Sequence, residues 1–409
     1  MFRISARVAT SMCLTVLGAC AIEPTADEPP TIEAVFNGAT CGNGVFDASE
    51  LCIAAPAAVI ATPDQVVTVL AVDVDADAHD DVVAASGQRI WVRRGVAGGF
   101  GAWVSLWTAG ASYTDVAVAD FDADGLPDLA ATDAGTNRVI VWHNNGGLTF
   151  SVWAQIAVGA NPVRILSARL DGDARADLVV LSFGTHQAQV LLATAAPFAA
   201  PVAYAVGDAE DLALGDCSGD GRADLLYANG VGAAAQLRAR VDGAAGNLGA
   251  PVVSALPLVD ATFGALDSFA IAAGDFDGDG DADAVVSAGS SRLAPMIDVG
   301  GCAFAPAFNA NTMPLTWAWT RARLRTVRWT ADANLDLAAP HGDPAAVGLQ
   351  SYSIVPGTGA GTFSPYLVQT HAAGAVIPKD LAFTDVNGDG RRDVLVAAST
   401  GVLLELRVP

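Results

Sequence analysis

Residues 116–132 read VAVADFDADGLPDLAAT: a short apolar run, a turn crowded with aspartates, and a second short apolar run. Short apolar runs on either side of an Asp- and Gly-containing turn indicate two strands joined by a tight loop. Counted with Asp120 as position 1, the loop carries aspartate at positions 1, 3, 5 and 9. The segment therefore predicts a strand–loop–strand unit whose loop concentrates negative charge.

The same pattern recurs along the chain. Copies of the loop begin at positions 73, 120, 169, 216, 275, 328 and 385, so 47 to 59 residues separate successive starts. The third and sixth copies are defective, because Arg169 and Arg328 stand at position 1. Each unit offers four strand candidates, which in the second unit are 116–119, 129–132, 138–143 and 150–158. Seven such units predict an all-β fold, a seven-bladed β-propeller with four-stranded blades.

The two ends of the repeat region complete each other. The seventh unit ends after its third strand candidate, residues 401–408, and so lacks an outer strand. Residues 53–61 precede the first unit and have no other partner in the repeat pattern. We predict that this N-terminal strand completes the last blade and closes the ring, leaving no long free edge. The propeller then spans residues 53–409.

The residues before the propeller carry export signals. Residues 1–19 combine Arg3 and Arg7 with a short apolar stretch and a small-residue end, which predicts a signal peptide. The sequence from Leu17 to Cys20, LGAC, resembles the lipobox of bacterial lipoproteins. The resemblance implies lipidation of Cys20 and anchoring at the outer membrane or cell surface of a bacterium, without a membrane-spanning segment. An ordinary signal peptide with a chance cysteine is the alternative.

A tether and a cysteine-flanked segment follow. Residues 20–40 are rich in Glu, Asp, Pro and Thr, a composition typical of a flexible tether. Residues 41–52 read CGNGVFDASELC and resemble the first half of a Cys-rich repeat of secreted bacterial proteins. We expect a local disulfide between Cys41 and Cys52 in an oxidising compartment. Cys217 and Cys302 remain, and they either pair or stay free.

Residues 120–122, DFD, and residues 275–280, DFDGDG, resemble the FG-GAP/VCBS repeat family, which includes the calcium-binding blades of integrin alpha chains. The resemblance extends over residues 53–409, is specific in the second, fifth and seventh copies, and is weak in the third and sixth. It implies a seven-bladed propeller with Ca²⁺ held in the loops between the first and second strands.

The loop composition suits a hard cation. Ca²⁺ takes six to eight oxygen ligands, and carboxylates at alternate positions 1, 3 and 5 would point into one loop. Position 7 would add a backbone carbonyl, position 9 would close the site, and glycine at position 6 would permit the turn. We expect about five structural Ca²⁺ sites, formed by Asp73, Asp75, Asp77, His79, Asp81, Asp120, Asp122, Asp124, Leu126, Asp128, Asp216, Ser218, Asp220, Arg222, Asp224, Asp275, Asp277, Asp279, Asp281, Asp283, Asp385, Asn387, Asp389, Arg391 and Asp393.

The alternative is that these loops are turns in which aspartates only accept local N–H groups. We favour that interpretation for the two defective copies. There we expect Arg169 and Arg328 to place a guanidinium among the remaining carboxylates, where it would replace the ion by an internal charge.

The composition excludes some functions. Hydrophobic residues make up 52% of the 409 residues and charged residues 16%, so most of the chain is not disordered. A net charge of −23 argues against nucleic-acid binding, because phosphate would be repelled. No zinc-protease, nucleophile-elbow, phosphate-loop or dinucleotide motif occurs, and no catalytic residue is identified.

An aromatic and basic cluster stands before the sixth loop. Its tryptophans and arginines alternate, which fits strands with one face in the core. One interpretation is a sugar- or anion-binding patch; the other is blade packing with arginines on the surface. The cluster comprises Trp317, Trp319, Arg321, Arg323, Arg325 and Trp329.

The sequence thus predicts a monomeric, surface-anchored, calcium-binding propeller that binds an extracellular protein or polysaccharide. Two alternatives stay open: an enzyme acting on extracellular polymers with the propeller as scaffold, and a lectin with one sugar site per blade. A fold of this kind does not by itself define a function.

Overall fold

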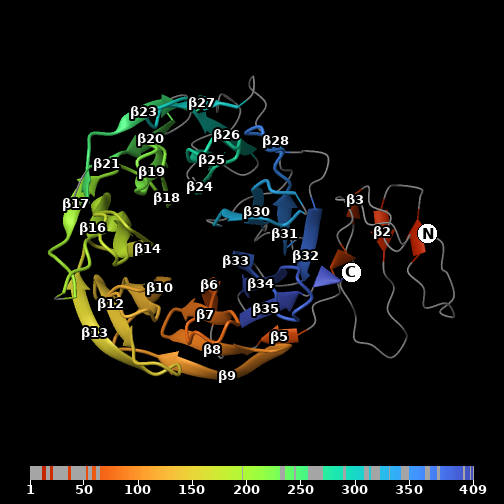
Figure 1. Ribbon diagram of the computed structural model, residues 1–409, viewed down its shortest axis with the longest axis horizontal. Coiled ribbons are helices and arrows are strands. Elements are labelled where there is room, and N and C mark those ends of the chain that lie inside the picture. The colour runs from red at the N-terminus through yellow and green to blue at the C-terminus, as the bar shows by residue number, and fades with distance from the viewer. Residues whose placement is uncertain are drawn as a thin grey trace.

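Seven antiparallel sheets stand around a central axis in this computed structural model (Figure 1). The structure describes residues 65–195, 197–230, 235–243, 246–256, 270–288, 292–307, 323–330, 332–341, 350–363, 378–398 and 401–405, with short strands at 12–14, 19–21, 36–37, 52–53, 58–60, 313–314, 369–374 and 407–408. Within these residues the only helix is a single 3₁₀ turn, η1 (Phe183–Thr185). No helix in this part of the chain is long and apolar enough to cross a membrane.

Each blade is built on four antiparallel strands, and in blades 1 to 6 these four run outward from the axis in chain order. Blade 1 contains β6 (Val66–Val72), β7 (Asp81–Ser86), β8 (Ile90–Val96) and β9 (Gly99–Leu106). Blade 2 contains β10 (Tyr113–Ala119), β11 (Asp128–Asp133), β12 (Arg138–Asn144) and β13 (Phe150–Ala157). Blade 3 contains β14 (Pro162–Ala168), β15 (Asp177–Ser182), β16 (Gln187–Leu191) and β17 (Val202–Ala205).

The next three blades repeat this order. Blade 4 contains β18 (Leu212–Gly215), β19 (Asp224–Asn229), β20 (Gln236–Arg240) and β23 (Val252–Ala255), with a small hairpin of β21 (Asp242–Gly243) and β22 (Asn247–Leu248). Blade 5 contains β24 (Ile271–Gly274), β25 (Asp283–Ala288), β26 (Arg292–Asp298) and β27 (Phe304–Pro306), and β28 (Met313–Pro314) also pairs with β26. Blade 6 contains β29 (Arg325–Val327), β30 (Asp336–His341), β31 (Gln350–Val355) and β32 (Gln369–Gly374).

Blade 7 joins the two ends of the repeat region. Its first three strands are β33 (Pro378–Thr384), β34 (Asp393–Ala398) and β35 (Gly401–Glu405), and its fourth is β5 (Ala58–Ile60). The register pairs Val59 with Leu403. Beyond it, β4 (Cys52–Ile53) pairs with β36 (Arg407–Val408). The prediction that an N-terminal strand completes the last blade is confirmed, and the predicted third strand at 401–408 is split into β35 and β36.

The core lies between the blades. Seven clusters of buried apolar side chains occur among the described residues, one at each interface between adjacent blades. The second strand of a blade is covered on both faces, so all six residues of β11 are buried. This explains the run of small and β-branched residues after each acidic loop, because close-packed sheets leave little room for larger side chains.

The predicted export segments fall largely outside the described residues. Short strands β1 (Met12–Leu14), β2 (Ala19–Ala21) and β3 (Phe36–Asn37) pair with one another. Cys41 lies outside the described residues, as do the side chains of Cys20 and Cys52. Lipidation at Cys20 and a disulfide between Cys41 and Cys52 therefore stay predictions.

Candidate functional site: the acidic loops and the central channel

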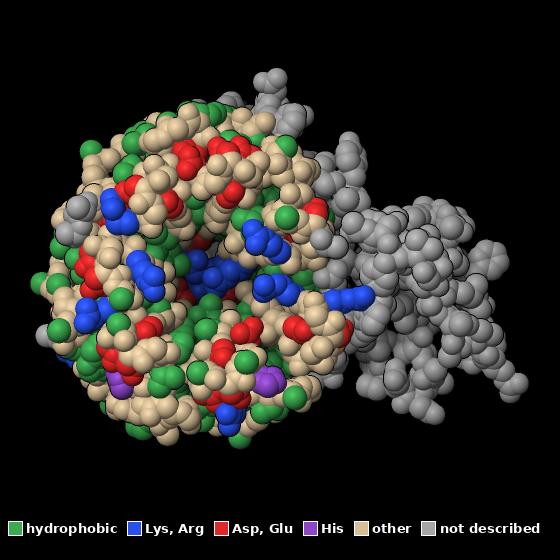
Figure 2. All heavy atoms as spheres, in the orientation of Figure 1, with side chains coloured by type: hydrophobic (Ala, Val, Ile, Leu, Met, Phe, Trp, Pro, Cys, Tyr) green, Lys and Arg blue, Asp and Glu red, His purple; other side chains and the backbone are tan. Residues whose placement is uncertain are grey.

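The seven acidic loops lie on one face of the ring. Each loop joins the first strand of a blade to the second, so all seven reach the same end of the central channel. Figure 2 shows this face, with acidic side chains distributed in a circle around the central hollow. Basic side chains gather in the hollow itself and on its rim over blades 6 and 7.

The aspartate at position 9 has the same structural contacts throughout the ring. In blade 2 the fully buried Asp128 accepts N–H bonds from Phe121 (3.2 Å) and Asn144 (2.8 Å). Its carboxylate thus ties position 2 of its own loop to the end of the third strand. Equivalent bonds to position 2 are made by all seven position-9 aspartates: Asp81, Asp128, Asp177, Asp224, Asp283, Asp336 and Asp393.

This contact does not depend on the rest of the acidic pattern. In the defective third loop, Asp177 accepts N–H bonds from Leu170 and Ala193, both at 2.8 Å. In the defective sixth loop, Asp336 accepts N–H bonds from Trp329 (2.8 Å) and Gly357 (2.9 Å). Position 9 therefore keeps its aspartate where position 1 has lost it, because the buried N–H groups need an acceptor whether or not an ion is bound.

Position 1 organises the loop backbone. Asp120 accepts N–H bonds from Ala123 (2.7 Å), Asp124 (3.2 Å) and Gly125 (2.9 Å). The other four predicted calcium loops have the same kind of bonds, centred on Asp73, Asp216, Asp275 and Asp385.

Backbone conformation separates the five predicted calcium loops from the defective third loop. In the five, positions 4 and 6 both have positive φ, including the alanines of the first loop, Ala76 (60°) and Ala78 (70°). In the third loop only position 4, Gly172, does so (79°). Left-handed alanine is unfavourable, so the first loop adopts this conformation against the local preference of its residues.

The two arginines at position 1 do not replace an ion as expected. Arg169 and Arg328 are exposed, and no loop carboxylate forms an ion pair with either among the described residues. An arginine has only donors, so it cannot accept the backbone N–H bonds that an aspartate receives at position 1. Both side chains are exposed instead, and the prediction of an internal guanidinium is wrong for both.

Carboxylates converge closely in three of the five predicted loops. Ligand oxygens lie within 4.8 Å of one another in the groups Asp73–Asp75–Asp81, Asp120–Asp122–Asp128 and Asp275–Asp277–Asp279. Among the described residues, the fourth and seventh loops do not bring three carboxylates this close. In the first loop the side chain of Asp75 is 2% exposed, yet its Oδ1 has no hydrogen-bond partner. An acceptor oxygen buried without a donor fits a cation in that loop.

The third strand supplies basic groups that the sequence analysis missed. Arg94 approaches Asp75 (2.7 Å) and Asp77 (3.1 Å), and His143 approaches Asp122 (2.9 Å). Each stands one residue before the N–H that binds the position-9 aspartate, so alignment of the third strands could have found both. In the fourth loop, the guanidinium of Arg222, expected to contribute only its carbonyl, pairs instead with Asp220 and Asp242.

The loops therefore differ in charge. Burial lowers the pKa of His143, but its hydrogen bond to Asn145 and the nearby carboxylates outweigh that effect and raise the pKa overall. No described basic side chain pairs with the fifth loop, and burial raises the pKa of Asp283 to about 6. The fifth loop thus has the largest uncompensated negative charge.

A second set of charges fills the central channel. The residue five positions before each loop lies on or just before the innermost strand. Going round the ring from blade 1, the seven residues at this position are Thr68, Asp115, Arg164, Asp211, Ala270, Arg323 and Asp380. The three aspartates each accept an N–H bond from the next blade, on Ile165, Ile271 and Val69.

The arginines of the channel pair with these aspartates. Arg164 contacts Asp211 at 2.8 Å, and Arg323 pairs with Asp115. Arg325 binds Asp380 through Nε (2.8 Å) and Nη2 (2.6 Å). Burial alone would raise the pKa of Asp380, but Arg325 and Arg323 outweigh it and hold that pKa at about 2. The expectation that these arginines lie on the surface is wrong for Arg323 and Arg325. Trp329 packs in the core as the structural interpretation predicted, whereas Trp317, Trp319 and Arg321 lie outside the described residues.

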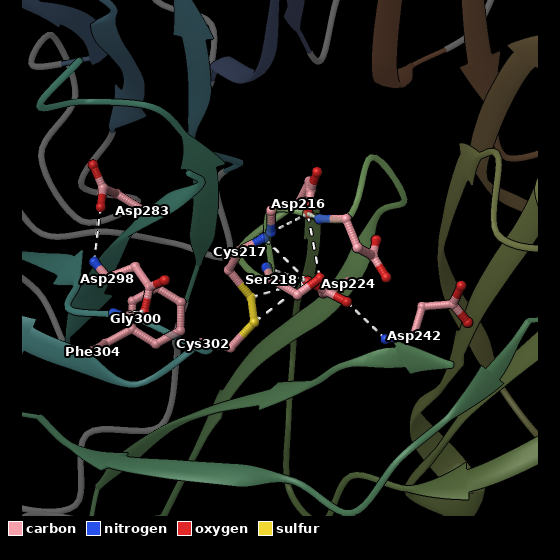
Figure 3. Close-up of a disulfide and its surroundings, with 12 residues drawn as sticks. Asp216, Cys217, Ser218, Asp224, Asp242, Asp283, Asp298, Gly300, Cys302 and Phe304 are labelled. Atoms are coloured by element: carbon pink, nitrogen blue, oxygen red, sulfur yellow. Dashed lines mark hydrogen bonds between the residues drawn. A yellow bond between two sulfur atoms is a disulfide. The ribbon is translucent and has the colours of Figure 1, made fainter. Parts of the chain in front are cut away.

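A disulfide joins blades 4 and 5. Figure 3 shows Cys217, at position 2 of the fourth loop, bonded to Cys302 in the turn between β26 and β27. Both cysteines are fully buried, and Asp224 lies beside the sulfur atoms. The sequence left this pairing open, because 85 residues separate the two cysteines.

Comparison with solved structures finds other propeller-sized chains at low sequence identity. A lectin of Agrocybe aegerita that recognises non-reducing terminal N-acetylglucosamine is 18% identical, with a TM-score of 0.51, over 76% of this chain and 81% of the lectin. BBS1N, solved in complex with ARL6DN, is 11% identical, with a TM-score of 0.56, over 87% of this chain and 95% of that chain. Virginiamycin B lyase from Staphylococcus aureus is 11% identical, with a TM-score of 0.55, over 88% of this chain and 99% of the lyase chain. At these identities the likeness supports the fold alone.

Sequence comparison identifies the repeat itself. No curated protein matches the chain. The FG-GAP-like repeat family matches twice, at residues 73–131 and 120–180, and each match begins at position 1 of an acidic loop. The chain is a seven-bladed β-propeller that contains FG-GAP-like repeats within residues 73–180.

Proposed function

We propose that this propeller is a calcium-stabilised binding module displayed outside the cell. The observation that carries the calcium part is the fifth loop, where Asp275, Asp277 and Asp279 converge within 4.8 Å and no described basic group pairs with them. Uncompensated carboxylates at this distance repel one another, and Ca²⁺ is a cation that oxygen clusters of this kind bind.

The three converging loops should differ in affinity. In the fifth loop a cation meets no competing charge. In the second, His143 competes when it is protonated, and in the first, Arg94 already contacts Asp75 and Asp77. We therefore expect the fifth loop to bind most tightly and the first to bind most weakly of the three. Bound Ca²⁺ would fix the loop between the first two strands of a blade, which stabilises the native state by binding it selectively.

Calorimetric titration of the metal-free full chain with Ca²⁺, with thermal unfolding recorded in parallel, tests this proposal. Asp279→Asn should remove one tight site and reduce the rise in melting temperature. Asp332→Asn is the matched control, because Asp332 holds the same position in the defective sixth loop. The calcium proposal fails if wild type binds no Ca²⁺, or if the two variants behave alike.

The display and binding parts rest on the N-terminal signals and on the fold class. We propose that lipid on Cys20 anchors the propeller at the outer membrane or cell surface and that its partner is an extracellular protein or polysaccharide. Cell fractionation of a Cys20→Ser variant tests the anchor, since loss of lipid should move the protein out of the membrane fraction. In the described residues the arginines deep in the channel pair with aspartates, which does not favour a catalytic centre there.

A further inference from the structure

A cavity of about 440 Å³ opens in the channel where blades 6, 7 and 1 meet. Three arginines line it: Arg325, Arg328 and Arg392. The remaining wall is largely apolar, and its partly exposed side chains include Leu70 from the innermost strand of blade 1 and Phe383 from the innermost strand of blade 7. A hollow of this size suits a small molecule, since ligand pockets range from roughly 300 to 1,000 Å³.

One of the three arginines is fixed by the ring of channel charges. Arg325 forms two parallel bonds to Asp380, which is itself fully buried and tied to the backbone of Leu381 (2.9 Å). A bidentate pair of this kind holds a guanidinium in one orientation. Arg325 is therefore held rigidly in the wall of the cavity, and its charge is already neutralised by Asp380. Any net positive charge in the cavity must come from the other two arginines.

Arg328 and Arg392 supply that charge. Both are exposed, and neither forms an ion pair or hydrogen bond within the described part of the chain. Arg328 occupies position 1 of the sixth loop, where five of the other loops have aspartate, and Arg392 occupies position 8 of the seventh loop. Two departures from the repeat thus place unpaired cations at a single cavity.

The packing of adjacent blades explains why these two positions meet. Position 8 of one blade lies against the residue just before the loop of the preceding blade: Ala282 against Gly215, and Leu335 against Gly274. The same relation brings position 8 of blade 7, Arg392, beside the end of β29 in blade 6, next to Arg328. The proximity of Arg328 and Arg392 is therefore a consequence of how adjacent blades pack.

We propose that this cavity binds a small organic anion. Its carboxylate or phosphate head lies between Arg328 and Arg392, and its less polar body lies against Leu70 and Phe383. Planar guanidinium groups recognise both kinds of oxyanion. The chain carries a net charge of −23, so its surface in general repels anions, and a local cationic pocket selects where an anion can bind. This inference rests on the proposed binding function and names a ligand class for it.

The test uses the calcium-loaded full chain and four small probes. Glucuronate and glucose 6-phosphate carry the two head groups, and glucose is the neutral counterpart. Isothermal titration should show binding of at least one of the two anionic sugars, weakened by added salt, and none of glucose. Inorganic phosphate carries the head group without a body. If inorganic phosphate binds more weakly than glucose 6-phosphate, the apolar wall contributes to binding.

Matched variants locate the site. Arg328→Gln and Arg392→Gln should each weaken the anion about tenfold or more, as expected for loss of one charge-assisted contact. Arg169→Gln is the control, because Arg169 also occupies position 1 of a defective loop and is exposed, but does not line the cavity. The inference is overturned if neither anionic sugar binds at millimolar concentration, if glucose binds equally well, or if Arg169→Gln has the same effect.

The calcium-induced rise in melting temperature is recorded on the same samples. If that rise is present and no anion binds, the inference fails and the calcium proposal stands. If anions bind with the expected variant pattern and no calcium effect is seen, the calcium proposal fails and the cavity assignment stands.

Discussion

At the scale of single residues, the position-9 aspartate combines two demands on one side chain. Its oxygens accept buried backbone N–H groups, and the remaining lone pairs can still face a cation. The first demand is met in all seven blades, whereas the second is expected only in the five loops that keep aspartate at position 1. An acidic repeat can therefore lose a metal site and still retain this aspartate.

Asp177→Ala tests the structural contact apart from any ion. The change leaves the N–H groups of Leu170 and Ala193 buried without an acceptor, so we expect a loss of about 2–4 kcal/mol of unfolding free energy. Urea unfolding should show the same loss in calcium and in chelator, because the third loop is not expected to bind an ion. Asp173→Ala, in the same loop but less buried, should cost little. A loss confined to calcium-containing buffer would contradict the structural interpretation.

Glu405 should make stability depend on pH. Its side chain is buried against Tyr352, whose hydroxyl donates to it, and burial raises the pKa of Glu405 to about 7 from an ordinary 4.5. Below pH 4.5 the carboxyl is protonated in both folded and unfolded chains, so its contribution to stability is complete. As pH rises, the unfolded chain ionises first, and stability falls until the folded pKa is passed, by up to about 3 kcal/mol.

Glu405→Gln should abolish this fall. Denaturant unfolding of wild type and variant between pH 4.5 and 8 checks the expectation, with the variant becoming the more stable protein at the alkaline end. Parallel pH profiles for the two proteins would show that another group is responsible.

At the scale of elements, the loops were predictable and the channel was not. Acidic positions and flanking apolar runs are local in sequence, and they identified every loop and the strands around it. The pairing of Arg323 with Asp115 joins blades 6 and 2 across the axis. Such a contact depends on convergence of innermost strands that are far apart in the chain, so no local pattern contains it. Arg94 and His143 are an intermediate case, because only comparison between blades aligns them with their loops.

The disulfide between blades 4 and 5 offers a prediction at this scale. Cys217 belongs to a loop of blade 4 and Cys302 to a turn of blade 5, so the bond links two adjacent blades covalently. Replacing both cysteines by alanine should lower the unfolding free energy by about 2–4 kcal/mol, mainly because the unfolded chain gains freedom. Thermal unfolding with and without reductant checks this: reduced wild type should approach the double variant, and the double variant should not respond to reductant. An unchanged melting temperature in the double variant would argue against a stabilising bond.

At the scale of the whole molecule, ring closure depends on three residues far from the rest of their blade. All residues of β35 are buried, and β5 covers its outer edge. Deletion of residues 52–60 should therefore expose an apolar strand edge and cause aggregation or loss of cooperative unfolding. Size-exclusion chromatography and calorimetry measure both effects. Deletion of residues 24–34, within the predicted tether, is the control and should leave both unchanged. A monomeric, cooperatively melting protein after the first deletion would show that the ring does not need β5.

The shared seventh blade also governs the order in which the molecule can form. β5 is synthesised before every other strand of the seven blades, only the short β4 preceding it, and β35 is synthesised after nearly all of them. Most contacts within a blade are local and can form early, but this one spans the whole repeat region, and among the described strand pairs only the adjoining β4–β36 pair joins residues farther apart in the chain. A non-local contact requires the chain to lose loop-closure entropy before the contact contributes any favourable interaction. We therefore expect the pairing of the chain ends to be a late and slow event on the folding pathway.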